Sequence, residues 1–222
     1  MKTVAGTGHS AKYLEVGDVK KLVIGFCTAL FVAASVPAYA AGLSVGPVAG
    51  VNWGDLSGVA SASAQAGFTG GGFVETTFNE NFGARLSAMY VRKGAKNNSN
   101  DAAAGPQSTT VKLDYVEFPL VFMAGSTPTH STAFRGFAGP VLAFNTGGKG
   151  KTKSGDEVDI KKDVKSTEFS VVIGAEVEHL RGSNSVFFDF SYTIGATNAF
   201  ELGDAKNRGL AVVAGMKFKL GS

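Results

Sequence analysis

The chain has 222 residues, a formal net charge of +3 at pH 7 and a single cysteine, Cys27. Residues 41–222 carry 17 basic and 16 acidic residues and no cysteine. This near-balance gives no support to a nucleic-acid partner, and it leaves no disulfide or thiol chemistry after residue 40. About 180 residues suit a single domain.

The first 40 residues have the pattern of an export leader. Lys20-Lys21 precede an apolar run over residues 22–36, and Ala38-Tyr39-Ala40 supplies small residues for cleavage. This combination is typical of a secretory signal peptide, and the run is shorter than the roughly 20 residues of a membrane-spanning helix. We expect cleavage after Ala40, and a translation start at Val19, because the preceding polar residues delay the signal.

Eight short runs with a period of two follow the leader. In one of them, Phe82, Leu86 and Tyr90 share one parity while Arg85 and Ser87 have the other. Such alternation places one set of side chains on each face of a sheet. The runs cover residues 43–53, 67–79, 82–94, 109–124, 133–145, 167–180, 185–195 and 208–220.

Short and long links alternate between these runs. The short links contain residues 79–81, 125–132 and 181–184, and the long links cover residues 54–66, 95–108, 146–166 and 196–207. A simple meander of eight strands puts all the short links at one end and all the long ones at the other. Outer-membrane barrels have this asymmetry. The sequence therefore predicts an all-β fold, an eight-stranded antiparallel up-and-down transmembrane β-barrel spanning residues 41–222.

The composition of the two strand faces separates a membrane barrel from a soluble one. The polar face consists mainly of Gly, Ser, Thr and Ala with scattered charges, whereas a face in contact with water is usually denser in Lys and Glu. A narrow lumen requires small residues and paired charges. The pattern favours a membrane barrel; a soluble periplasmic ligand-binding barrel remains an alternative.

Aromatic residues gather near the predicted strand ends, where they would form girdles at the two membrane interfaces. Ordinary packing of aromatic residues in a β-protein is the alternative. The predicted girdle comprises Trp53, Phe82, Tyr90, Tyr115, Tyr192 and Phe218.

The run 109–124 changes parity in its middle, because Leu113 and Tyr115 are odd while Phe118 and Leu120 are even. A β-bulge near Tyr115-Val116 would turn both sets toward lipid. The nearby Lys112, Asp114 and Glu117 would then point into the lumen.

Residues in this run resemble a known family. Leu113-Asp114-Tyr115-Val116-Glu117-Phe118-Pro119-Leu120 is similar to the Y-L-E-I-P-L core of the PorT-like, OmpX/OmpA-type outer-membrane β-barrel domain, with Phe118 in place of the usual Ile or Val. Three further features fit in order and spacing: residues 46–52, Arg92-Lys93-Gly94 and Gly139-Pro140. The resemblance implies the same barrel fold and the outer membrane of a Gram-negative bacterium.

The last predicted strand is similar to the terminal signal that the barrel-assembly machinery recognises. Gly215, Phe218 and Leu220 supply its glycine and alternating hydrophobic residues, although an aromatic residue usually ends the signal. The implied partners are the assembly machinery and the periplasmic chaperones that precede it.

Charged residues on the polar faces predict an internal network, because a buried charge without a partner is costly. The predicted members are Arg85, Lys93, Lys112, Asp114, Glu117, Arg135, Glu176, Asp189 and Lys217. Such a network would form either a plug or a narrow ion-conducting pathway. We favour the plug, since side chains just fill an eight-stranded barrel.

The sequence identifies no catalytic, cofactor-binding or metal-binding residues. His130 and His179 remain after the leader, both near the predicted short links, and neither belongs to a motif with a serine and an acid. An outer-membrane lipid-modifying enzyme remains an alternative. We expect a non-enzymatic barrel that maintains the envelope or presents its loops to an extracellular ligand, in contact with membrane lipid and lipopolysaccharide.

Overall fold

The computed structural model describes residues 42–57, 62–97, 108–126, 131–152, 156–199 and 206–220. The leader, its predicted cleavage site, the predicted start at Val19 and His130 lie outside these residues. In the described part of the chain, no helix is long and apolar enough to cross a membrane.

Eight long strands build the structure, and their order in space follows the chain. They are β1 (Leu43–Ser57), β2 (Ala62–Thr77), β3 (Phe82–Asn97), β4 (Ser108–Gly125), β5 (Thr132–Thr152), β7 (Thr167–Arg181), β8 (Asn184–Gly195) and β9 (Lys206–Leu220).

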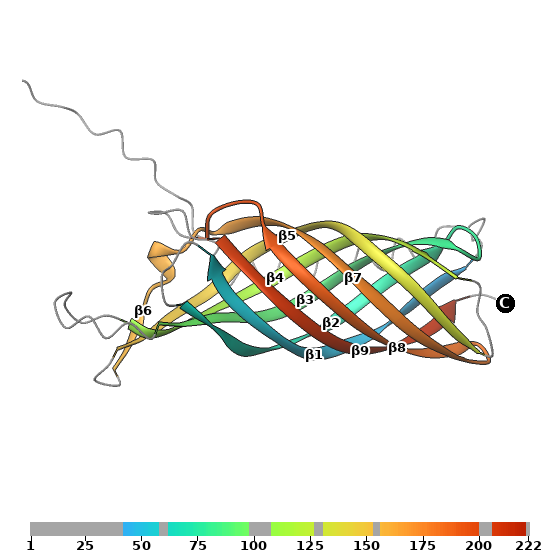
Figure 1. Ribbon diagram of the computed structural model, residues 1–222, viewed down its shortest axis with the longest axis horizontal. Coiled ribbons are helices and arrows are strands. Elements are labelled where there is room, and N and C mark those ends of the chain that lie inside the picture. Colours follow the sequence, from blue (N-terminus) through green and yellow to red (C-terminus); the bar gives the residue numbers. More distant parts are fainter. Residues whose placement is uncertain are drawn as a thin grey trace, which may run out of the picture.

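Neighbouring strands pair antiparallel, and β9 pairs with β1, so the sheet closes into a barrel (Figure 1). Closure removes the unpaired strand edges that an open sheet would expose. The predicted eight-stranded antiparallel barrel is confirmed.

The two ends of the barrel differ as the link lengths predict. Residues 78–81, 126–131 and 182–183 connect strands at one end, which also carries the C-terminal end of β9, at the right in Figure 1. The longer connections lie at the other end. Here β1 and β3 run to Ser57 and Asn97, beyond their predicted limits, because backbone pairing continues where the alternation of side chains has ended.

Part of the predicted link 146–166 has regular secondary structure. Strand β5 continues to Thr152, the short strand β6 (Glu157–Asp159) pairs with it, and the 3-10 helix η1 (Lys161–Asp163) follows. Lys149 lies opposite Asp159 and Lys151 lies opposite Glu157. Opposite charges on facing positions favour antiparallel pairing, which explains the extension of the hairpin.

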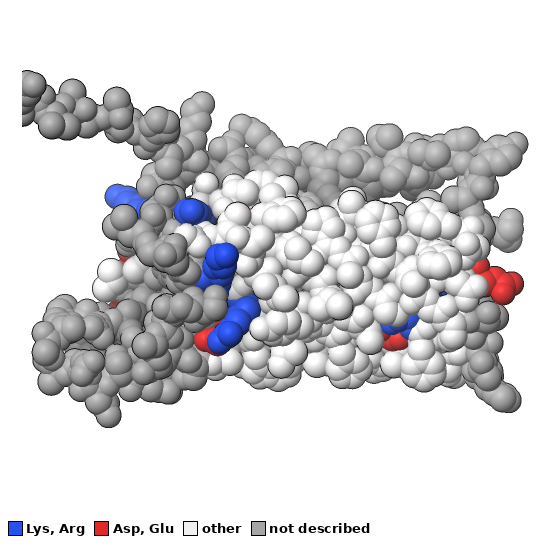
Figure 2. Space-filling view, turned by 45° about the horizontal axis from the view of Figure 1, so that its top comes forward, with Lys and Arg blue, Asp and Glu red and all other residues white. Residues whose placement is uncertain are grey.

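The outer surface of the barrel is apolar along its middle. Figure 2 shows a white central band, with basic side chains toward the end that carries β6. Large exposed hydrophobic residues cover this band, including Leu86, Leu120, Phe122, Ile173, Phe188, Phe190 and Leu210. A bilayer would bury such a surface, whereas water would not.

Strand β4 keeps one parity throughout, contrary to the predicted bulge at Tyr115-Val116. Leu113, Tyr115 and Glu117 all face the interior. The extra residue is Thr146 on β5, since Asp114 pairs with Gly147 and Tyr115 with Asn145. No bulge at Tyr115-Val116 is required, because the interior accommodates Leu113 and Tyr115 in a cluster with Ala143 and Val164.

Glycines on the inner face make room for aromatic rings. A Cβ atom added to Gly215 would lie 2.3 Å from Cζ of Phe187, and one added to Gly174 would lie 2.4 Å from Cζ of Phe137. The barrel interior is therefore filled by rings that lie against bare backbone.

Gly174→Ala should destabilise the barrel by about 1–3 kcal/mol, the usual cost of overpacking. The new methyl group would also lie 2.6 Å from the backbone oxygen of Phe190, which cannot move alone. In Gly136→Ala, the matched control, the nearest atoms are 3.9 Å away. Urea unfolding in lipid vesicles measures both variants, and equal stability of the two would contradict this packing.

Candidate functional site in the barrel lumen

Arg85 on β3 is the centre of a buried charge cluster near the short-link end. Its guanidinium donates to Glu75 Oε2 at 2.6 and 2.9 Å and to Asp189 Oδ2 at 2.8 Å, and it also pairs with Glu176. Its central carbon lies 4.9 Å and 4.5 Å from the ring centroids of Phe73 and Phe187. Three carboxylates and two ring faces thus stabilise one buried cation.

Lys217 on β9 joins the same cluster from the opposite wall. Its Nζ lies 2.9 Å from Glu75 Oε1, 2.8 Å from Glu176 Oε1 and 2.9 Å from Glu178 Oε2. Ammonium has three donor hydrogens, so each can meet one carboxylate. Lys217 is 2% exposed, and these three partners replace the water it has lost.

Arg135 on β5 completes the inner network, a name we use for Glu75, Arg85, Arg135, Glu176, Glu178, Asp189 and Lys217. Arg135 pairs with Glu75 at 3.0 Å, Glu176 at 3.3 Å and Glu178 at 2.9 Å. The seven residues come from six of the eight barrel strands. The network therefore crosses the lumen rather than lining one side of it.

Five of the nine residues predicted for the lumen belong to the inner network, and Glu75 and Glu178 were missed. Glu178 continues the parity of Glu168 and Glu176 along β7, so the alternation contained the signal for it. Glu75 faces inward with Phe73 on β2, where small and aromatic residues dominate the pattern. Both are 4% exposed or less.

A second polar group, the outer cluster, lies nearer the long-link end and comprises Lys93, Tyr115, Glu117, Glu168 and Asn207. Lys93 Nζ lies 2.6 Å from Glu117 Oε1 and 3.9 Å from Glu168 Oε1. Asn207 Nδ2 donates to Glu168 Oε2 at 2.5 Å and to the Tyr115 hydroxyl at 3.2 Å. Here one cation faces two buried carboxylates.

Two residues predicted to face the lumen lie on the outer surface. Lys112 is exposed, and Asp114 accepts a 2.7 Å hydrogen bond from Nε of Arg92, which is 48% exposed in its side chain. The physical reason is the constant parity of β4: even positions point outward, so Lys112 and Asp114 cannot share a face with Glu117. The prediction for these two residues is wrong.

Tyr115 does not belong to an aromatic girdle, because it is fully buried in the outer cluster. The other predicted members lie on the outer surface, where Trp53, Phe82, Tyr90 and Phe218 are 40%, 55%, 36% and 37% exposed, and Tyr192 is half-buried. Trp53 and Tyr192 flank Leu210 toward the long-link end. Phe82 begins β3 and Phe218 lies near the end of β9, both toward the short-link end.

The residues of the predicted assembly signal lie in β9, the strand that closes the barrel. Gly215 faces inward against Phe187, whereas Phe218 and Leu220 are partly exposed on the outside. Phe218 pairs with Val45 and Leu220 with Leu43 on β1.

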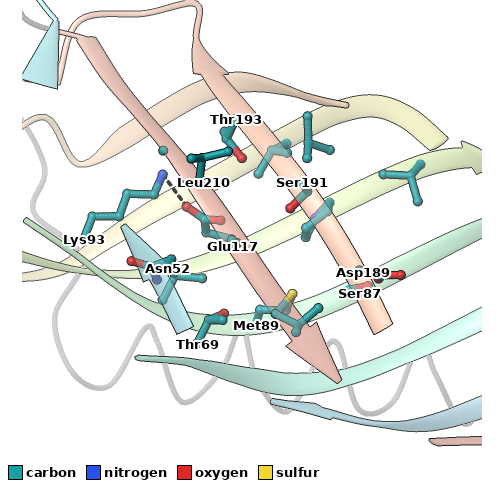
Figure 3. Close-up of a pocket in the computed structure, with 18 of the residues that line it drawn as sticks. Asn52, Thr69, Ser87, Met89, Lys93, Glu117, Asp189, Ser191, Thr193 and Leu210 are labelled. Atoms are coloured by element: carbon teal, nitrogen blue, oxygen red, sulfur yellow. Dashed lines mark ion pairs between the residues drawn. The ribbon is translucent and has the colours of Figure 1, made fainter. Parts of the chain in front are cut away.

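A cavity of about 110 Å³ separates the inner network from the outer cluster. Figure 3 shows Lys93 and Glu117 joined by an ion pair on one side of it and Asp189 and Ser87 on the other. Asn52 and Thr69, from the paired strands β1 and β2, line the same space. The lumen thus contains two charged layers with a chamber of mixed polarity between them.

Beyond the barrel wall, the β5–β6 hairpin carries exposed charges. Lys149 Nζ donates to Glu157 Oε2 at 3.1 Å, and this hydrogen bond holds the pKa of the Glu157 carboxyl below its ordinary value. The pair is open to solvent, so it contributes little to stability.

Arg85→Met should destabilise the barrel by about 3–5 kcal/mol, because it leaves three buried carboxylates short of a cation. Arg208→Met removes an exposed pair with Asp55 at 2.8 Å and should cost at most about 1 kcal/mol. Urea unfolding in vesicles, followed by Trp53 fluorescence, compares the two variants. A smaller loss for Arg85→Met than for Arg208→Met would contradict the role of the inner network.

Comparison with known proteins agrees with this architecture. The family model described as "Outer membrane protein beta-barrel domain" matches residues 34–201. None of the curated proteins to which the chain was compared matches it.

Three solved structures illustrate the similarity. Ail, the attachment invasion locus protein of Yersinia pestis, is 17% identical, with a TM-score of 0.40 over 80% of this chain and 99% of that one. Neisserial surface protein A is 12% identical, with a TM-score of 0.49 over 80% and 97%. OprG from Pseudomonas aeruginosa is 12% identical, with a TM-score of 0.44 over 82% and 98%.

The family match covers three quarters of the chain, and the closed barrel has the apolar outer surface that such a family requires. The soluble alternative does not fit these two findings. The chain belongs to the outer membrane protein beta-barrel domain family, and it is a small eight-stranded outer-membrane barrel.

Proposed function

We propose that this barrel is a non-enzymatic outer-membrane protein with a plugged lumen, which contributes to envelope integrity or presents its long-link end to an extracellular ligand. The observation behind the plug is the inner network. Its seven side chains come from six strands, and each carboxylate has at least one cationic partner within 4 Å. An eight-stranded barrel leaves just the space that such side chains fill.

The alternative, a narrow ion-conducting pore, would require the inner network to open. Moving Arg85 or Lys217 aside would separate several buried ion pairs at once, and each unpaired charge would be costly in the lumen. The close ring contact, with Phe73 and Phe187 centroids 5.4 Å apart, further narrows the path beside Arg85. These contacts favour a closed lumen over a conducting one.

The alternative of a lipid-modifying enzyme finds little support in the position of its candidate base. His179 lies on the outside of β7 near the short-link end, while outer-leaflet lipid would meet the long-link end. We therefore retain the non-enzymatic assignment as part of the proposal.

The proposal extends to the route into the membrane. Residues 1–40 would act as a cleaved signal peptide, periplasmic chaperones would escort the chain, and the assembly machinery would recognise β9 through Gly215, Phe218 and Leu220. We also propose membership of the PorT-like, OmpX/OmpA-type branch, on the basis of the Tyr115-x-Glu117-x-Pro119-Leu120 core.

Basic side chains around the long-link end provide a contact for lipopolysaccharide. Lys112 and Lys149 are exposed, and the side chains of Arg92 and Arg208 are 48% and 47% exposed. Lys112 lies opposite Lys149, Arg92 opposite Asp114 and Arg208 opposite Asp55, toward the long-link end of their strands. Figure 2 shows basic side chains at this end of the apolar band, where anionic headgroups would meet the barrel. Cations at this level attract phosphate groups of the outer leaflet.

In planar lipid bilayers, the purified protein should show no steady single-channel current in about 1 M KCl. At this salt concentration the charges on the protein surface are largely screened. Arg85→Ala, which shortens the central side chain, should produce current events that the wild type lacks. Arg92→Ala, on the outer surface, is the control and should stay silent. Steady conductance of the wild-type barrel would refute the plug.

Surface proteolysis tests the orientation. Trypsin added to intact cells should cut after β6, where Lys162 is exposed, and leave the eight barrel strands intact. Arg181, exposed at the short-link end, should be protected until the outer membrane is permeabilised. Cleavage at Arg181 in intact cells would mean that the barrel faces the other way.

A further inference from the structure

The lumen cavity borders carboxylates of both charged layers. Glu117 of the outer cluster and Asp189 of the inner network line it with their cationic partners Lys93 and Arg85, and Arg208 also borders it. Its uncharged polar lining residues include Asn52, Thr69, Ser191 and Thr193. A buried water needs roughly 10–15 Å³ of such space, so a cavity of about 110 Å³ has room for a small organic molecule or several waters.

The two layers are short of positive charge. Among the described residues, the buried carboxylates of both groups outnumber the cations by two. The acids are Glu75, Glu117, Glu168, Glu176, Glu178 and Asp189, and the cations are Arg85, Lys93, Arg135 and Lys217. Excess negative charge inside a barrel is unfavourable unless a positive charge compensates it. The cavity lies between the two layers and is the space available for that charge.

Polar atoms on the cavity wall lack hydrogen-bond partners. Both amide atoms of Asn52 and Oγ1 of Thr69 are buried without a partner, and these residues are 6% and 2% exposed. Oδ1 of Asp189 is in the same state, and Oε1 of Glu117 and Nζ of Lys93 have only their mutual ion pair. Unsatisfied buried polar atoms cost about 1–3 kcal/mol each. Four of these six atoms are oxygens, and an occupant rich in donor hydrogens would satisfy those four.

The remainder of the wall is apolar. Met89, Val121, Phe137, Val141, Val172 and Val213 line the cavity, and Val121, Phe137, Val141 and Val172 also form one hydrophobic cluster. The described residues contain no group of three or more His, Cys, Asp or Glu side chains that could hold a metal ion, so the wall does not suit a divalent cation. An ammonium group uses three donors, and an attached alkyl tail could contact the apolar side.

We propose that the lumen cavity binds a small primary ammonium ion with a short apolar tail. The ammonium group meets the unpartnered oxygens and supplies positive charge between the two layers. The tail lies against the valines and Phe137. This site goes beyond the proposed envelope role, and it is separate from any ligand of the external loops.

The test uses ethylammonium chloride as the probe and ethanol as its neutral counterpart of similar size. The purified protein is titrated in detergent micelles at constant ionic strength, and the side-chain amide signals of Asn52 are followed by NMR. Ethylammonium should give saturable shifts, and ethanol should bind at least tenfold more weakly. Competition by KCl would support the cation site and add an inorganic ion to its occupants.

Variants locate the binding. Thr69→Val replaces a hydroxyl with a methyl group of similar shape, and Asp189→Asn removes a charge; each should weaken ethylammonium binding at least tenfold. Asp114→Asn on the outer surface is the matched charge control and should leave the affinity unchanged. If Asp189→Asn fails to fold, the ethylammonium affinity of Thr69→Val still tests the proposal.

Three results would overturn the proposal. They are shifts that do not saturate, ethanol binding as tight as that of ethylammonium, and an unchanged affinity in Thr69→Val.

Discussion

Closing eight strands into one barrel creates a narrow interior in which every side chain must find both space and a partner, and the remaining features of the structure follow from that constraint. The inner network satisfies this constraint with ion pairs. Its three cations and four acids come from six strands, and they interact with one another in place of the water lost on burial. Every member except Asp189 has two or more oppositely charged partners, so removing one of them alters several ion pairs at once. This is why the network acts as a unit rather than as a sum of separate pairs.

Close packing of aromatic rings fills the interior where ion pairs do not. Phe73 and Phe187 pack edge to face at 5.4 Å, and Arg85 lies close to both rings. Gly174 and Gly215 leave the backbone bare where Phe137 and Phe187 approach it. Small residues on one strand thus permit large ones on the next, and the abundance of glycine reflects the crowded interior rather than flexible turns.

The same closure leaves the outer face free to be apolar. Because alternate residues point outward, Leu86, Phe122, Ile173 and Phe190 form a surface that suits lipid, while the exposed charges gather toward the ends. The chamber between the two charged layers is lined by Asn52 and Thr69, whose buried polar side-chain atoms have no hydrogen-bond partner. Its unpartnered polar atoms, and the excess of carboxylates in the two layers around it, are why we consider it a binding site rather than a packing defect.

The sequence alone determined the strand number, the antiparallel meander and the difference between the two ends, because period-two alternation and link lengths are local properties of the chain. It also indicated which face of β3, β7 and β8 points inward. Arg85, Arg135, Glu176, Asp189 and Lys217 were predictable as lumen residues for the same reason.

Tertiary structure decided what depends on register between strands. It placed a bulge at Thr146 of β5 instead of at Tyr115-Val116 of β4, with Tyr115 inside and Lys112 and Asp114 outside. It also brought Glu75, far away in sequence, to Lys217 at 2.9 Å. The sequence of a single strand does not reveal which neighbouring strand carries an extra residue. It also does not reveal which distant side chain lies at the same height in the barrel, because the register between strands is set only when the sheet closes.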